Sequence, residues 1–174
     1  MPNKPSKTFA VLLRQATELS LQDTAFKHDS SGVTSTAKYS LSYSVTLYNY
    51  KLKGTGGFYG RTLLTEPKPL KPSATTNGML ETAEAETIVF HTNYTEKTSV
   101  LVVELVVVRE HNFQKVCASA GYTTCQIFDF TPQAIKQVGV QSGTPRQIGA
   151  IESEKAMMQT NRVGKALLEF DIRE

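Results

Sequence analysis

The chain has 174 residues, enough for one domain with a hydrophobic core and too few for two comfortable ones. Nineteen basic and sixteen acidic residues give a formal net charge of +3, too small to indicate nucleic acid as a partner. Cys117 and Cys125 are too few for a disulfide scaffold, and within one continuous segment they would lie too far apart to bond. A reduced, intracellular protein is favoured. Arg14 and Gln15 break the apolar stretch near the start, which argues against a secretory signal.

The first half of the chain predicts three strands. Residues 9–14 alternate weakly and predict the first strand, although residues 16–21 could instead continue as a short helix. The clearest alternation follows over residues 39–47, which predicts a long strand with one buried and one solvated face. The apolar face carries Tyr39, Leu41, Tyr43, Val45 and Leu47. The phase breaks at residues 48–50, which indicates a bulge or an exchange of partners. After a hairpin-type connection, residues 58–64 return as a strand.

Residues 65–86 predict a long surface loop, because Pro67, Pro69 and Pro72 interrupt ladder pairing. A helical turn is expected at 79–85 and another within 131–140. Turn-forming residues occupy 27–32. The remaining predicted strands cover residues 86–91, 100–108, 121–128, 147–151 and 166–172.

The run from Val100 to Val108 is apolar except for Glu104. A membrane-spanning helix needs about twenty apolar residues, and β-branched residues favour a strand, so this run predicts a strand buried on both faces. About eight strands without alternating helices predict an all-β fold, an antiparallel β-sandwich in one domain. An up-and-down barrel is the alternative. Glu104 is expected to form a buried ion pair, with Arg61 as the candidate partner.

Catalytic, metal and cofactor sites are not indicated. A hydrolytic site needs a nucleophile beside a base, and the three histidines, His28, His91 and His111, lack such a setting. Cys117 and Cys125 have no further ligands at zinc-site spacing, and the aspartates are too scattered for a calcium site. We therefore expect a protein that is not an enzyme and has no cofactor.

One local cluster of basic residues accompanies the predicted hairpin and the proline-bearing loop. It consists of Lys51, Lys53, Arg61, Lys68 and Lys71. Such residues can simply keep a sheet edge soluble and unpaired. Alternatively they bind an acidic protein surface, a phosphate or a lipid headgroup. The nearby glycines at 54, 56 and 57 lack the lysine of a phosphate-binding loop and precede a strand, so a turn with positive φ explains them better.

Several short motifs occur in an order that resembles the amino-terminal region of the nephrocystin-4 family. In chain order they are Phe58-Tyr59-Gly60-Arg61-Thr62, the Lys/Pro tract, Ile88-Val89-Phe90-His91-Thr92, Val103-Glu104-Leu105-Val106, Gly121-Tyr122 with Gln126-Ile127-Phe128, and Gly143-Thr144-Pro145-Arg146. The resemblance covers about residues 38–150, and the first and last motifs are the distinctive ones.

The resemblance implies a C2-like β-sandwich over residues 8–174 behind an N-terminal tail, residues 1–7. It also implies a non-enzymatic scaffold protein of the cilium, at the transition zone, that binds other ciliary proteins. The axoneme is the other expected location. Tubulin is a candidate partner, because the Lys/Pro tract could face its acidic surface. The family's proteins are large and multidomain, so their further domains and partners are not carried over. The alternative is a calcium-independent peripheral membrane module of C2 type, in which Lys51, Lys53, Lys68 and Lys71 contact anionic lipid.

Overall fold

The computed structural model describes residues 6–21, 24–26, 37–52, 56–82, 84–93, 98–126, 136–141, 143–145 and 162–173. In these ranges the chain forms eleven strands, eight of them six residues or longer, and every strand pair is antiparallel. The strands are β1 (Lys7–Leu19), β2 (Lys38–Asn49), β3 (Gly57–Leu64), β4 (Lys68–Pro69), β5 (Lys71–Pro72), β6 (Leu80–Thr82), β7 (Glu86–Thr92), β8 (Ser99–His111), β9 (Gln114–Gln126), β10 (Lys136–Gln141) and β11 (Arg162–Arg173). The predicted all-β antiparallel fold is confirmed.

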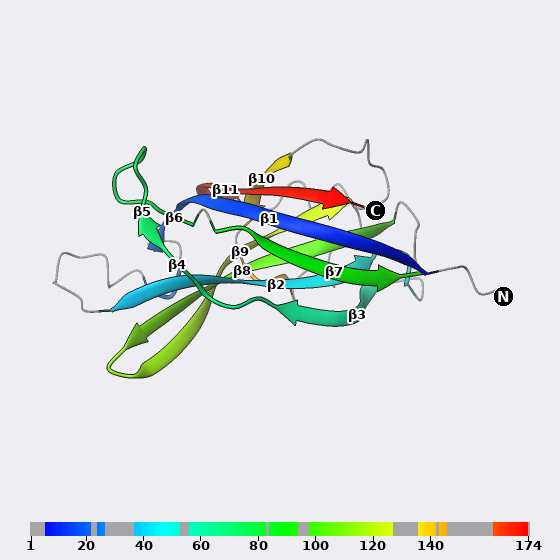
Figure 1. Ribbon diagram of the computed structural model, residues 1–174, viewed down its shortest axis with the longest axis horizontal. Helices are drawn as coiled ribbons and strands as arrows, with labels where there is room; N and C mark the ends of the chain where they lie inside the picture. The colour runs from blue at the N-terminus through cyan, green and yellow to red at the C-terminus, as the bar shows by residue number, and fades with distance from the viewer. Residues whose placement is uncertain are drawn as a thin grey trace.

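The strands belong to one sheet that folds over into two layers (Figure 1). Neighbours follow in the order β3-β2-β8-β9-β10-β11-β1-β6-β5, with β4 also paired to β2 and β7 to β1. One layer contains β2, β3, β8 and β9, and the other contains β1, β7, β10 and β11. The layers join through β9 and β10, where Gln141 and Tyr122 are the one residue pair in register among the described residues. The architecture is therefore a sandwich made from one continuous sheet.

Strand β8 is the centre of the core and is buried on both faces, as predicted. Its inner face contributes four side chains, each at most 1% exposed, to the core between the layers: Leu101, Val103, Leu105 and Val107. On the opposite face, Val100 and Val102 form a second apolar cluster with Tyr48 and Tyr122. Burying such side chains contributes about 1.5–3 kcal/mol each, so this strand contributes much of the driving force for folding.

Strand β1 continues to Leu19, so the alternative of a helix over residues 16–21 is wrong. Its buried residues are spaced by two at Phe9, Val11 and Leu13 and then by three at Ala16 and Leu19. The pairing with β11 shifts between Leu13 and Gln15, and the pairing with β6 shifts between Ala16 and Leu19. Each irregularity adds a residue and returns the next apolar side chain to the core face.

Residues 65–86 form three short strands rather than a continuous loop, and the expected helical turn at 79–85 is replaced by β6. Strand β4 pairs with β2, and β5 pairs with β6, which pairs with β1. The Leu70 N–H donates to the Tyr39 carbonyl at 3.0 Å, and the Ser73 N–H donates to the Met79 carbonyl at 2.8 Å. The prolines limit β4 and β5 to two residues each without preventing pairing. The segment thereby carries the chain from the edge of one layer to the edge of the other.

Strand β2 departs from its predicted pattern at two points. Its pairing with β8 is regular through Asn49 and Ser99, so no bulge occurs in that pairing at residues 48–50. Tyr48 instead packs on the second apolar face, with ring centroids 5.4 Å from Tyr50 and 5.0 Å from Phe58. The predicted solvated face is also partly covered, because Ser42 is buried and donates to the Thr65 carbonyl at 2.6 Å.

The later part of the chain agrees with the prediction in part. Strand β9 begins at Gln114, well before the predicted start at residue 121, and contains both cysteines, neither of which forms a disulfide. Residues 136–141 form β10, where a helical turn was expected. The predicted strand at 147–151, the turn at 27–32 and the end of the strand predicted for 121–128 lie outside the described residues. Lys7, assigned to the tail, is the first residue of β1.

Replacing Val103 by Asp is expected to unfold the domain or destabilise it by several kcal/mol, because the side chain is 0% exposed and a buried unpaired carboxylate is costly. Urea denaturation followed by circular dichroism measures the change. Val116→Asp is the matched control on β9, where the valine is 48% exposed and little loss is expected. Equal stability of the two variants would contradict the central place of β8.

Tyr43→Phe is expected to raise the free energy of unfolding by about 1 kcal/mol, because the Tyr43 hydroxyl is buried without a hydrogen-bond partner among the described residues. Burial also raises the pKa of Tyr43. Since tyrosine in an unfolded chain ionises near pH 10, the wild-type protein should lose stability above about pH 10 more steeply than the variant. Urea titrations at about pH 8 and about pH 11, on either side of the pKa of tyrosine in the unfolded chain, test both points. A destabilised variant would indicate that the hydroxyl is satisfied in solution.

Candidate functional site

The two free edges of the folded sheet lie side by side and leave a groove between them. Among the described residues, β3 pairs with β2 alone and β7 with β1 alone, and the two strands run in opposite directions along one side of the molecule (Figure 1). We call the space between them the open seam. A groove of about 410 Å³ occupies it. Its lining residues are Val45, Thr46, Leu47, Gly60, Arg61, Leu63, Val89, Phe90, His91 and Leu101.

One end of the open seam is closed by the chain itself and by an ion pair. The Lys68 ammonium lies 3.4 Å from a Glu86 carboxylate oxygen at the start of β7 and 4.0 Å from one of Glu84. The side chains of Lys68 and Glu86 are 28% and 27% exposed, so solvent only partly screens this contact. Lys68 therefore connects the two layers where the segment after β3 crosses from one to the other.

Arg61 lies in the open seam and makes no ion pair with any described residue. It belongs to the irregular part of β3, where the pairing with β2 shifts between Val45 and Leu47 and Gly60 has a φ of +75°. The expected pair between Arg61 and Glu104 does not form. Glu104 is half-buried on the other face of β8, between Ser44 and Tyr122 in the register.

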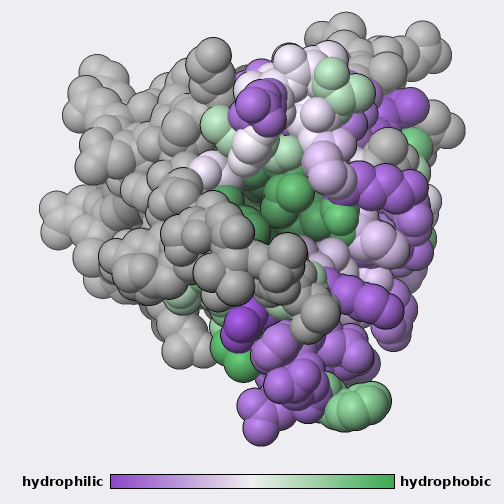
Figure 2. Space-filling model, turned by 90° about the vertical axis from the view of Figure 1, so that its left-hand side faces the viewer, coloured by the Kyte–Doolittle hydropathy of each residue, from purple (hydrophilic) through white to green (hydrophobic). Residues whose placement is uncertain are grey.

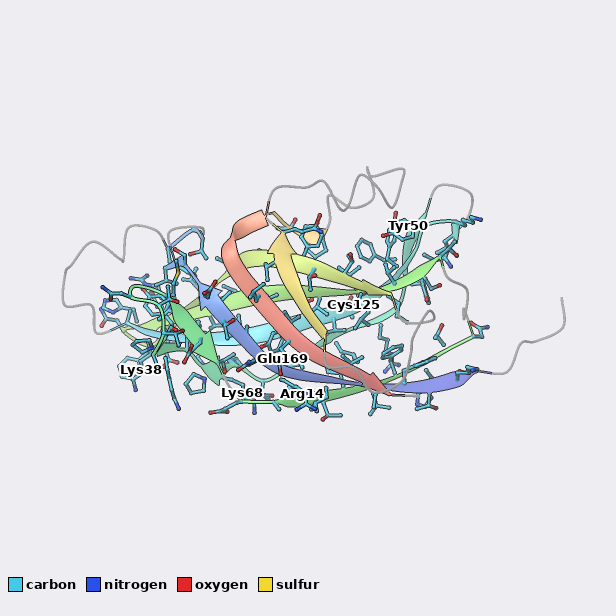
Figure 3. All side chains as sticks on the ribbon, turned by 90° about the horizontal axis from the view of Figure 1, so that it is seen from above. Arg14, Lys38, Tyr50, Lys68, Cys125 and Glu169 are labelled. Atoms are coloured by element: carbon cyan, nitrogen blue, oxygen red, sulfur yellow. The ribbon has the colours of Figure 1, made fainter. Side chains whose placement is uncertain are left out.

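The basic residues predicted as a cluster are dispersed along the edge of one layer. In the register of β2, Lys68 pairs with Leu41, Arg61 lies opposite Thr46, and Lys51 follows the end of the strand. Steps of five residues span about 17 Å along a strand, about twice the Debye length at physiological ionic strength. Figure 3 shows Lys68 and Tyr50, the neighbour of Lys51, well apart. These charges therefore act separately.

The other two predicted site residues are placed as follows. Lys71 is exposed on β5, at the edge of the second layer, and makes no ion pair with a described residue. Lys53 lies outside the described residues. Binding of a partner by any of the five residues stays a prediction. Of the three glycines expected in a turn with positive φ, Gly56 has a φ of +80°, as predicted. Gly57 is the first residue of β3 and does not have positive φ, and Gly54 lies outside the described residues.

A second surface feature, missed in the sequence, is the tip of the hairpin formed by β8 and β9. The hairpin projects from the body of the molecule, and hydrophilic side chains gather on it at the bottom of Figure 2. Asn112 and Phe113 form its two-residue turn with φ of 49° and 62°, and Phe113 is fully exposed at 101%. Glu110 and Lys115 form an ion pair of 3.8 Å across the hairpin. A phenylalanine in this conformation is uncommon, and the usual turn residue would be Gly or Asn.

The described residues contain no group of three or more His, Cys, Asp or Glu that could hold a metal ion. His91, predicted to be structural, lies with Nδ1 2.9 Å from Thr8 Oγ1 on the neighbouring strand. In the described ranges no helix has the length and hydropathy needed to cross a membrane.

No protein-family model and no curated protein matches the chain. Membership of the nephrocystin-4 family stays a prediction from the motifs.

Lys68→Ala is expected to lower the free energy of unfolding by about 0.5–1 kcal/mol, because it removes the ion pair with Glu86 and leaves that half-buried carboxylate unpaired. Lys71→Ala is the matched control, since its exposed ammonium pairs with no described carboxylate. Thermal denaturation at low and high salt measures both variants. A loss equal in the two variants, or unaffected by salt, would argue against the ion pair as the cause.

Proposed function

We propose that this chain is a non-enzymatic structural protein of the cilium, in the axoneme or the transition zone, that binds other ciliary proteins through its sandwich. The observation that carries protein binding is the open seam, where two sheet edges flank an apolar groove and no further described strand pairs with either edge. Monomeric proteins usually cover or charge such edges, and an apolar groove beside them is typical of a protein-binding surface. The ciliary setting is supported by the motif order shared with the nephrocystin-4 family.

Tubulin is a candidate partner because three exposed basic side chains face solvent near the sheet edges. They are Lys51, Arg61 and Lys71. Since they lie more than a Debye length apart, each would contact a separate acidic group, and the contribution of each would fall as salt is raised. Lys68 contributes less to such a contact, because Glu86 already pairs with it.

The proposal predicts that the tagged chain concentrates in cilia and sediments with microtubules in low salt. Combined Lys51→Glu, Arg61→Glu and Lys71→Glu changes should weaken sedimentation by about tenfold or more, because acidic tubulin would then be repelled. Lys115→Glu is the control, since that lysine is exposed on the hairpin and already paired. A diffuse cytosolic signal without ciliary enrichment would contradict the ciliary role, and unchanged sedimentation of the triple variant would contradict the basic contact.

The second candidate function is calcium-independent binding to anionic membranes, which the fully exposed Phe113 at the hairpin tip favours. Aromatic side chains at such tips can enter the membrane interface, with Lys115 near the headgroups. Flotation with phosphatidylserine vesicles, free of calcium, distinguishes this function. If the protein binds membranes in this way, Phe113→Ser should abolish flotation. Replacing Lys51, Lys53, Lys68 and Lys71 together by Glu should abolish it as well.

A further inference from the structure

We propose that β7 accepts an extended peptide of a partner protein as an additional strand, and that a carboxylate of this peptide pairs with Arg61 across the open seam. The inference deepens the proposed protein-binding function, on which it rests, by assigning the surface and the chemistry of the partner. Addition of a strand to a free edge uses main-chain hydrogen bonds for affinity and side-chain pockets for specificity.

The edge of β7 is regular enough to template another strand. Its pairing with β1 runs without a shift from Leu13 and Glu86 to Lys7 and Thr92. Its sequence, Glu-Thr-Ile-Val-Phe-His-Thr, contains neither proline nor lysine, which are the residues that commonly protect an edge. Val89, near its middle, is 53% exposed. The outer main-chain groups of β7 have no strand partner among the described residues.

The opposite side of the open seam supplies side-chain contacts rather than a second regular edge. Strand β3 is irregular around Gly60, where its register with β2 shifts, and a strand of this kind pairs poorly. The groove between the strands is lined mainly by aliphatic and aromatic side chains, including Leu47, Leu63 and Leu101. Alternate side chains of a peptide on β7 would point toward this lining, because successive residues of a strand face opposite sides.

Arg61 determines the charge of the expected peptide. Arg61 lines the groove without an ion pair to a described residue, and Glu86, at the closed end of the open seam, is paired with Lys68. A planar guanidinium binds a carboxylate through two parallel hydrogen bonds, and apolar surroundings strengthen that pair. We therefore expect alternating apolar residues with one Asp, Glu or terminal carboxylate.

A charge-swap selection tests the specificity. A phage library of random twelve-residue peptides is selected on the wild-type protein and on the Arg61→Glu and Lys38→Glu variants, because Lys38 is exposed on β2 and does not line the groove. Wild-type and Lys38→Glu proteins should enrich acidic, alternating apolar sequences, whereas Arg61→Glu should enrich Lys or Arg at the acidic position. A synthetic peptide from the wild-type selection should bind Arg61→Glu at least about tenfold more weakly, the loss typical of a charged hydrogen-bonded pair. The assignment to Arg61 would be overturned if no peptide were enriched on the wild-type protein. It would also be overturned if the peptides selected on Arg61→Glu kept an acidic residue at that position.

Amide hydrogen exchange tests the binding mode with the same synthetic peptide. Bound peptide should slow exchange of alternate amides in Glu86–Thr92, because those groups would become hydrogen-bonded. Val89→Glu should reduce affinity at least about tenfold by repelling the peptide carboxylate, whereas Thr87→Glu, on the same strand but not lining the groove, should change it little. Peptide binding that leaves amide exchange in β7 unchanged would overturn strand addition. Dodecanoate, a fatty acid, is the competitor: if it displaces the peptide from the groove and exchange in β7 is not slowed, strand addition is likewise overturned.

These outcomes are separate from those of the proposed function. Diffuse localisation with intact peptide binding would refute the ciliary role and leave strand addition in place. Ciliary enrichment of a protein that selects no peptide would refute strand addition and leave the ciliary role in place.

Discussion

The fold depends on the burial of β8 on both of its faces. Leu101, Val103 and Leu105 need the opposite layer to cover them, while Val100 and Val102 need the aromatic side chains of the second cluster. A sheet with an apolar strand at its centre cannot leave either face in water, because each exposed valine or leucine would forfeit about 1.5–3 kcal/mol. Folding one continuous sheet into two layers satisfies the first requirement, and the tyrosines satisfy the second.

This way of covering β8 explains why two sheet edges in the described part of the chain lie free on one side of the molecule. The layers are continuous through β9 and β10, so the opposite side must be closed by other means. The segment after β3 crosses there, and the ion pair between Lys68 and Glu86 connects the layers beside the crossing. Beyond that point β3 and β7 do not pair, and the open seam remains. The candidate site is therefore a consequence of how the sheet closes. It lies where the edges of the two layers meet, not in the core.

The long, regular strands could be predicted from the sequence because their side chains alternate without interruption. The inner residues of β2 are an example, since Leu41, Tyr43 and Val45 all reach the core. The continuation of β1 was ambiguous because a spacing of three resembles a helical period, and only pairing with β6 and β11 selects a strand with bulges. Strand β6 was also not predictable, because its three residues form a strand only by pairing with β1 and β5.

The candidate site could be predicted only in part, for a related reason. Basic residues close in sequence suggested a cluster, but a strand separates them by about 3.3 Å per residue and the crossing segment carries Lys71 to the second layer. The open seam joins residues that are some thirty positions apart, and neither Arg61 nor Val89 carries a local signal of that proximity. Phe113 was overlooked because a hairpin turn without Gly lacks the usual turn signal.

The two distinctive motifs can be separated into residues that the fold requires and residues that it does not. Gly60 and Gly143 both have positive φ, at +75° and +93°, a conformation that favours glycine. Within the first motif, Phe58 packs on Tyr48. Arg61 is exposed and pairs with no described carboxylate, so neither packing nor an ion pair there accounts for it. Arg61 is therefore the residue of the first motif that the proposed binding at the open seam would use.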